Sequence, residues 1–334
     1  MSEINKVNRI LVSDINRISE LNANDAVRIN GELLSSPSPP PTPSAYNNVP
    51  VLDASVSVNW ASATKHLNVL PGIQSASNMF CAGDYIYCPE FYTGKLWRAP
   101  TSDPLTWEIY LADLPGAAPR YSAPAIIDGS VYLYGPGTQI IYASLSDLSS
   151  WTLSGTSLPR TFGYGTSLLS DTNVYLMGGF SNKNEYMYAP LNDPTNFSYS
   201  TYSNDLNPTG FAFRYNNTYY HVGGDEVNYG ATPETIQTNT KVCIPSKNWW
   251  RQGVVIGSNL YVIGDLAEVR EVDLTGPMTS STVVGTIPES PFLFYGSMVA
   301  VQNKLYLFGG NTGSFNVDSA ISFDLTGNTT NQPS

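Results

Sequence analysis

Charged side chains are scarce in this sequence, and most of those present are acidic. Asp, Glu, Lys and Arg make up 13% of the 334 residues, about half the usual share, and the formal net charge is −11. A surface with so few cations cannot neutralise a phosphate backbone or dock on an anionic bilayer. We therefore expect neither nucleic-acid nor membrane partners.

Cysteine and histidine are also rare, with three and two copies. No two cysteines form a CxxC motif, which argues against a disulfide framework or a structural zinc site. Two scattered imidazoles cannot make a three-ligand catalytic zinc site without carboxylate help. We predict no metal and no cofactor. His221 lies close to Asp225 and Glu226, and this group is either an acid–base or metal cluster or, as we favour, a structural strand histidine beside an acidic loop.

Long hydrophobic runs and targeting signals are absent as well. No apolar run approaches the ~20 residues that span a bilayer. The first residues lack a basic region followed by an apolar stretch, so we predict no signal peptide. Hydrophobic residues nevertheless make up 42% of the chain, enough for a sizeable core.

A repeated short strand containing tyrosine is the main positive feature of the sequence. Its copies recur 41 to 45 positions apart, which is the length of one four-stranded propeller blade. The six tyrosines are Tyr87, Tyr132, Tyr175, Tyr220, Tyr261 and Tyr306. Each copy follows an apolar strand and a turn, such as Asp128-Gly129, which favours a tight hairpin. We therefore predict an all-β, six-bladed β-propeller over residues 51–326.

The two ends of the repeat array predict how the ring closes. The sixth copy stops after its third strand, near Asp324, and lacks an outer strand. A spare outer strand lies before the first copy, around residues 56–69, and begins near Trp60. We expect this N-terminal strand to complete the last blade.

The pattern resembles the Kelch-type propeller family. The resemblance rests on Tyr strands followed by Gly-Gly, as at Gly178-Gly179, and on a Trp or Phe that opens the outer strand, as at Trp107 and Phe197. The first copy departs from the pattern, because it lacks the double glycine. Some members of the family are copper oxidases, but the required ligand set cannot be placed in this sequence.

The N-terminal part divides into a short repeat and a linker. Residues 35–50 are rich in proline and predict an extended spacer, and residues 327–334 predict a flexible tail. Residues 1–34 carry an Ile-Asn-Lys/Arg-Ile repeat that resembles structural proteins of tailed bacteriophages. We leave open whether this segment is helical or strand-like, and we assign virion anchoring to Ile4, Val7, Ile15, Ile18 and Ile29. The segment is too small to be a stable domain alone, so we expect it to bind other virion proteins or to form a homo-oligomer.

Contiguous catalytic motifs are absent: there is no nucleophile elbow, Walker loop or dinucleotide fingerprint. Four acids follow the Tyr strands of the fourth and fifth copies, but spacing along the chain cannot show that they converge: Asp225, Glu226, Asp265 and Glu268. We therefore predict a protein that is not an enzyme.

The best candidate site is a binding surface on the links that join each outer strand to the next inner strand. Aromatic rings stack on sugars, and Arg supplies a rigid set of hydrogen-bond donors. The candidate ligand-binding residues are Arg120, Tyr121, Arg160, Phe162, Tyr164, Trp249, Trp250, Arg251 and Tyr295. The alternative is that these aromatics pack between blades.

These features together predict a non-enzymatic accessory protein of a phage virion. It would be assembled in the host cytoplasm as part of a tail, neck or capsid appendage, and would bind a host-surface glycan or another protein. One alternative is a carbohydrate-active propeller, such as a sialidase-like depolymerase. Another is a cellular Kelch-type scaffold for protein partners.

Overall fold

The computed structural model describes most of the predicted propeller and only two short strands before it. The described residues are 28–29, 32–33, 49–70, 79–90, 93–116, 123–135, 137–163, 165–179, 184–203, 206, 210–242, 244, 252–263, 267–288, 296–309 and 318–327. The chain divides into two compact units, Met1–Ser44 and Ala45–Gln332. In the first unit, β1 (Arg28–Ile29) and β2 (Glu32–Leu33) form an antiparallel pair.

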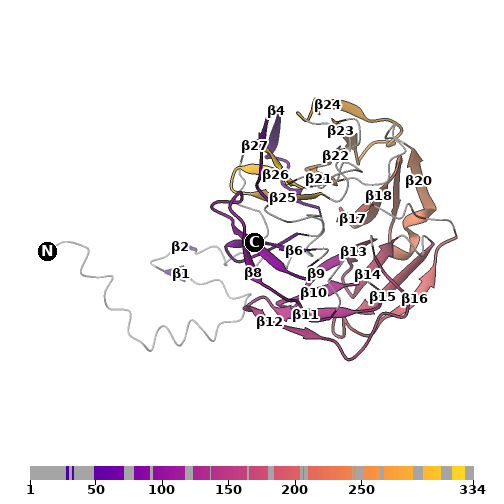
Figure 1. Cartoon of the computed structure of the whole chain (residues 1–334). Coiled ribbons are helices and arrows are strands. Elements are labelled where there is room, and N and C mark those ends of the chain that lie inside the picture. Colours follow the sequence, from indigo (N-terminus) through magenta and orange to yellow (C-terminus); the bar gives the residue numbers. More distant parts are fainter. Residues whose placement is uncertain are drawn as a thin grey trace. The chain divides into compact units, whose positions relative to one another are not determined.

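The second unit is a ring of six blades, each built on four antiparallel strands, which confirms the predicted six-bladed propeller (Figure 1). The inner strands are β5 (Phe80–Ala82), β9 (Ala123–Ile127), β13 (Gly165–Leu169), β17 (Gly210–Tyr215), β21 (Gln252–Ile256) and β25 (Ser297–Val301). The second strands, which carry the repeated tyrosines, are β6 (Tyr85–Pro89), β10 (Ser130–Tyr134), β14 (Asn173–Gly178), β18 (Thr218–Gly223), β22 (Asn259–Ile263) and β26 (Lys304–Phe308). The third strands are β7 (Leu96–Pro100), β11 (Ile140–Ser144), β15 (Glu185–Pro190), β19 (Glu226–Gly230), β23 (Glu268–Asp273) and β27 (Ala320–Thr326). The outer strands are β8 (Glu108–Leu111), β12 (Asp147–Leu153), β16 (Ser198–Thr201), β20 (Asn239–Val242), β24 (Thr282–Thr286) and β4 (Ser57–His66).

The alternation of strand direction gives the ring two different ends. Inner strands turn into second strands at one end, which we call the lower end. Second strands pass into third strands, and outer strands into the next inner strand, at the opposite, upper end. The lower turns are tight: Asp128 and Gly129 both have positive φ, 46° and 72°, as a two-residue hairpin turn of this hand requires.

The N-terminal strand β4 closes the ring as predicted. It pairs with β27 from Thr326↔Ser57 to Ala320↔His66 and so supplies the outer strand of blade 6. The Trp60 ring packs against Tyr261 of blade 5 and Phe323 of blade 6, with centroids 5.2 and 5.1 Å away. At the seam between the last and first blades, Trp107 meets Phe308 edge to face. The first and last blades therefore share one hydrophobic interface.

A short strand on the channel side of blade 5 was not predicted. β3 (Val51–Leu52) runs parallel to the inner strand β21 and lies on its free edge. Val255 N–H donates to Pro50 O at 2.9 Å, and Gly257 N–H donates to Leu52 O at 3.0 Å. Because β3 runs in the direction of β21, Val49 lies nearer the upper end than Leu52.

The segment between β19 and β20 of blade 4 contains a 3-10 helix, Pro233–Thr238, that packs on blade 3. Its Ile236 is fully buried against blade 3. The Tyr202 hydroxyl donates to Pro233 O at 2.9 Å, and the Tyr175 hydroxyl donates to the Glu234 carboxylate. The insertion therefore tightens the joint between blades 3 and 4.

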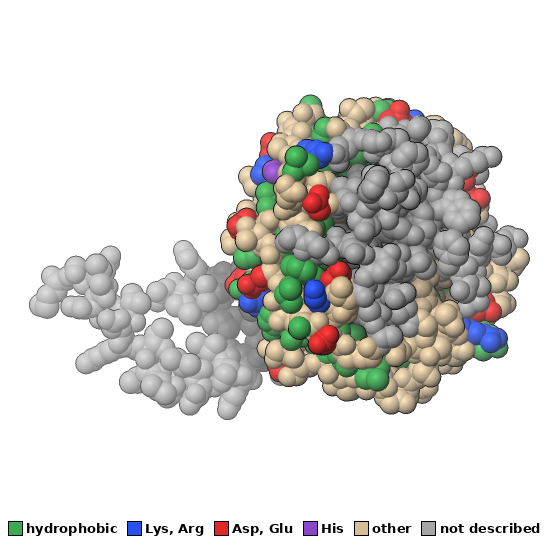
Figure 2. All heavy atoms as spheres, in the orientation of Figure 1, with side chains coloured by type: hydrophobic (Ala, Val, Ile, Leu, Met, Phe, Trp, Pro, Cys, Tyr) green, Lys and Arg blue, Asp and Glu red, His purple; other side chains and the backbone are tan. Residues whose placement is uncertain are grey.

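The surface agrees with the low charge content. On the face shown in Figure 2, most of the described surface is uncharged, with acidic and basic side chains scattered over it. No helix among the described residues is long and apolar enough to cross a membrane.

Candidate functional site

The structure describes two of the nine predicted ligand-binding residues, Arg160 and Phe162. The other seven lie outside the described residues: Arg120, Tyr121, Tyr164, Trp249, Trp250, Arg251 and Tyr295. Of the predicted anchoring residues, Ile29 lies in β1, and Ile4, Val7, Ile15 and Ile18 are likewise outside the described part. These roles stay predictions.

Phe162 packs between blades 2 and 3, and its predicted role as a ligand contact stays a prediction. It is 4% exposed and lies in the core cluster shared by blades 2 and 3. Its backbone exchanges two hydrogen bonds with Gly137, of 2.7 and 2.9 Å. A Cβ atom on Gly165 would come within 2.6 Å of the ring. This packing agrees with the alternative interpretation, an aromatic residue between blades.

Arg160 lies on the upper end and joins two residues that the sequence did not single out. Its guanidinium stacks on the ring of Tyr199 in β16, 4.4 Å from the ring centroid, and Nη2 donates to the Tyr199 hydroxyl at 3.1 Å. Its Nε lies 3.8 Å from Glu185 Oε2 in β15. Tyr199 is 47% exposed, so one aromatic surface remains open to solvent. We call Arg160, Glu185 and Tyr199, together with the cavity beside Glu185, the blade 2–3 groove.

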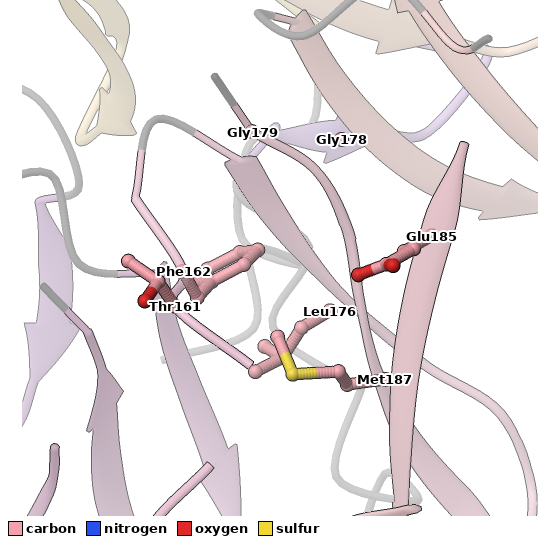
Figure 3. A pocket seen from close by; sticks show the side chains of 7 residues that line it. All are labelled: Thr161, Phe162, Leu176, Gly178, Gly179, Glu185 and Met187. Carbon is pink, nitrogen blue, oxygen red and sulfur yellow. The ribbon is translucent and has the colours of Figure 1, made fainter. Parts of the chain in front are cut away.

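A small cavity lies beside Glu185 (Figure 3). Its volume is about 10 Å³, which is room for one water molecule. The lining residues are Thr161, Phe162, Leu176, Gly178, Gly179, Glu185 and Met187. Glu185 Oε2 is buried and has no hydrogen-bond partner, because 3.8 Å is too long for a hydrogen bond from Arg160. Glu185 Oε2 therefore faces a cavity with room for a hydrogen-bond donor such as a water molecule.

The double glycine of the third copy shapes this cavity. Gly179 has φ +102°, and a Cβ there would lie 2.9 Å from Gly163 O. The Gly178-Gly179 pair thus lets the end of β14 approach the link that carries Arg160. The repeated glycines of the sequence have a structural use at the upper end.

The acids of the fourth and fifth copies are divided between two neighbouring blades. Glu226 and Glu268 are the first residues of β19 and β23. Glu268 pairs with Arg270 at 2.6 Å. Asp265 lies outside the described residues. In the described part of the chain no three His, Cys, Asp or Glu residues gather as a metal site.

His221 is a buried strand residue, 1% exposed. It lies opposite Asn228 in the β18–β19 ladder, and Thr240 donates to Asn228 Oδ1 at 2.6 Å. Among the described residues His221 Nδ1 and Asn228 Nδ2 have no hydrogen-bond partner. Burial lowers the pKa of His221 to about 4, so the imidazole is neutral at pH 7 and has the structural role that we favoured.

We expect His221 to make the propeller less stable in mild acid. An unfolded histidine takes up its proton near pH 6.5, whereas His221 in the fold does so at about pH 4. Between these values the unfolded state binds the extra proton, so stability falls as the pH drops and the loss levels off below about 4. The loss amounts to about 3 kcal/mol. Urea unfolding at several pH values from about 7 to 4 measures it, with His221→Gln as comparison. If the unfolding free energies of the wild-type protein and of His221→Gln depended on pH in the same way, this assignment would be contradicted.

Comparison with known proteins shows the fold. No family model and no curated protein matches the sequence. Among similar solved structures, YjhT superposes with a TM-score of 0.57 at 13% identity, over 80% of this chain and 98% of that one. A streptogramin B lyase structure superposes with a TM-score of 0.51 at 12% identity, over 81% of this chain and all of the other. The Kelch-type and phage resemblances are not shown by these comparisons and stay predictions.

The lyase corrects the expectation that this protein is not an enzyme. A similar solved propeller is an enzyme by its name, so the absence of a contiguous motif does not exclude catalysis on this fold. The absence of contiguous catalytic motifs does not exclude an enzyme, because such motifs contain only residues that are neighbours in the sequence. Arg160, Glu185 and Tyr199 come from a link and two strands. What the comparisons establish for this chain is a six-bladed β-propeller fold.

Proposed function

We propose that this protein is a carbohydrate-active propeller enzyme whose substrate contacts the blade 2–3 groove. One observation carries the proposal. The Arg160 guanidinium contacts both the exposed ring of Tyr199 and the carboxylate of Glu185. Glu185 Oε2 has no hydrogen-bond partner and lies beside a cavity with room for one water molecule. This interpretation takes up the carbohydrate-active alternative from the sequence.

Each part of the groove has a use in sugar chemistry. The open face of Tyr199 can stack on the apolar face of a sugar ring. Arg160 can donate to hydroxyls, since its planar group carries five N–H donors. Carboxyl groups are the usual acids and bases of glycoside hydrolysis. Glu185 is placed to accept a proton from a water molecule in the cavity, which is the role of a general base.

The test uses the full chain and a panel of bacterial surface polysaccharides. We expect new reducing ends on incubation, and we expect Glu185→Gln to lower their rate by about 10²-fold or more while binding stays within a few-fold. Tyr199→Ala should weaken binding about tenfold, because a stacked aromatic contributes ~1 kcal/mol or more. Ile109→Ala is the matched control, since Ile109 is also 47% exposed on an outer strand. The proposal would be refuted if the full chain neither cleaved nor bound any polysaccharide of the panel.

Attachment to a particle stays a prediction from the sequence. What supports it is the N-terminal repeat and the proline-rich linker that precede the propeller. The expected partners, other virion proteins and a host-surface glycan, remain part of that prediction.

A further inference from the structure

A row of three paired side chains crosses each blade from its second strand to its outer strand, and in blade 4 this row is polar. It consists of His221, Asn228 and Thr240, which lie opposite one another in the β18–β19 and β19–β20 ladders. The row begins directly after the repeated tyrosine, and the other five blades have an apolar residue there: Cys88, Leu133, Leu176, Val262 and Leu307. Blade 4 thus replaces an apolar side chain with an imidazole.

The row of blade 4 faces the joint between blades 3 and 4. In the other blades its first residue belongs to the core cluster shared with the preceding blade, as Leu133 does for blades 1 and 2 and Leu176 for blades 2 and 3. His221 has the corresponding place. It lies opposite Ala212, which belongs to the cluster that joins blades 3 and 4. His221 is 1% exposed and Asn228 2%, so both are enclosed when the joint is closed.

Hydrogen bonding satisfies only the outer part of this row. Thr240 Oγ1 donates to Asn228 Oδ1 at 2.6 Å, and Thr240 itself is exposed to solvent. Asn228 Nδ2 and His221 Nδ1 have no partner among the described residues. Because unsatisfied buried polar groups are costly, this joint is less favourably packed than one whose row begins on leucine.

The groups around His221 do not neutralise a proton on its ring. Arg214 is paired with Asp171 at 2.5 Å, and Glu234 accepts from the Tyr175 hydroxyl. Burial is the cause that lowers the pKa of His221, with no contribution from an ion pair. The titratable and charged side chains that face this joint from the surrounding elements are Tyr175, Tyr186, Tyr188, Tyr202, Arg214, Tyr219, Asp225, Glu226 and Glu234.

We propose that the joint between blades 3 and 4 opens in mild acid, because a protonated His221 has no partner in the closed joint and gains water in the open one. The other five joints, whose rows begin on apolar side chains, stay closed. The acid sensitivity expected of His221 is thereby placed in one joint of the ring.

The size of the effect follows from the two proton affinities of the imidazole. In the open joint His221 takes up its proton near pH 6.5, as an exposed histidine does, and in the closed joint at about pH 4. Each pH unit between these values therefore multiplies the open population about tenfold as the pH falls. From about pH 7.5 to about pH 5 we expect a rise of about 30-fold.

Thiol labelling of the full chain measures the opening of single joints. Ala212→Cys places a reporter in the blade 3–4 joint, and the native Cys88, fully buried between blades 6 and 1, is the internal control. A dipyridyl disulfide labels thiols at both pH values, and each rate is divided by that of the unfolded chain at the same pH. We expect the corrected rate at position 212 to rise about 30-fold in acid and that of Cys88 to stay constant. Mass spectrometry of peptides identifies the labelled position.

Three variants locate the response on His221. His221→Leu introduces the residue that blades 2, 3 and 6 have at this position, and His221→Gln keeps a polar side chain that does not titrate. Both should remove the acid response. His66→Gln, at the only other histidine of the sequence, should leave it unchanged. Circular dichroism melting at about pH 7.5 shows whether each variant folds, and Met177→Cys, on the blade 3 side of the joint, is the second reporter if Ala212→Cys does not.

Three results would overturn the proposal. One is a corrected labelling rate at position 212 that does not change between the two pH values. Another is an equal rise at position 212 and at Cys88, which would mean that the whole ring unfolds rather than one joint. The third is an acid response that persists in both His221→Leu and His221→Gln, which would assign the opening to other groups.

Discussion

Deleting residues 1–68 should leave a protein that does not fold into a stable propeller. The deletion removes β4, which supplies the outer strand of blade 6. It also removes Trp60, whose ring fills the space between Tyr261 and Phe323. Loss of a buried Trp side chain alone costs about 3–5 kcal/mol, and a whole domain has only about 5–15 kcal/mol of stability. We expect aggregation or a broad, early thermal transition.

A shorter deletion is the control for this experiment. Removing residues 1–48 leaves β3, β4 and the described ring intact, so its melting temperature should match that of the full chain. Removing residues 1–54 takes away β3 but keeps β4, and should give an intermediate loss. Soluble yield, size-exclusion profile and circular dichroism melting measure the series. Equal melting temperatures for the 1–48 and 1–68 deletions would show that blade 6 does not depend on β4.

Gly210→Ala should destabilise the propeller by about 3 kcal/mol or more. Gly210 opens the inner strand β17 and pairs with Gly223. A Cβ atom there would lie 2.0 Å from the Val222 carbonyl oxygen, a backbone atom that cannot turn away. The strand pair must therefore shift, and strain of this kind belongs to the few mechanisms that give large single-residue effects.

Gly155→Ala is the matched comparison for that substitution. A Cβ on Gly155 meets nothing within 4 Å, and its backbone has no positive φ. We expect a change within about 0.5 kcal/mol, as for an ordinary surface substitution. Chemical denaturation of both variants gives the two values. If Gly210→Ala were as mild as Gly155→Ala, the close approach of β17 to β18 in this structure would be wrong.

The architecture was predictable because its signal repeats. One tyrosine strand recurs at blade length, so six weak local signals reinforce one another, and the missing outer strand at the C-terminus identifies its replacement around Trp60. Both predictions are confirmed by the sheets and by the β27–β4 pairing. Repetition carries this information because each blade needs the same strands in the same order.

The blade 2–3 groove, β3 and the 3-10 helix were not predictable, because their signals are not repeated along the sequence. Arg160 and Tyr199 are 39 positions apart and meet only through the packing of blades 2 and 3. Nothing in the local sequence marks Glu185 as facing a cavity. β3 is two residues long, and its partner β21 lies about 200 positions later, so no local periodicity reveals the pairing. Within the described residues the 3-10 helix occurs in one blade, so it has no repeat to support it.

The course of β3 also determines how the ring responds to pulling. A force applied to the chain before Val49 acts along the strand axis and loads the bonds from Val255 to Pro50 and from Gly257 to Leu52 together. Tension would be carried first by the innermost strand of blade 5, and β4 would feel it only after that pair has ruptured. The closing strand β4 is therefore mechanically shielded by the two-residue strand β3.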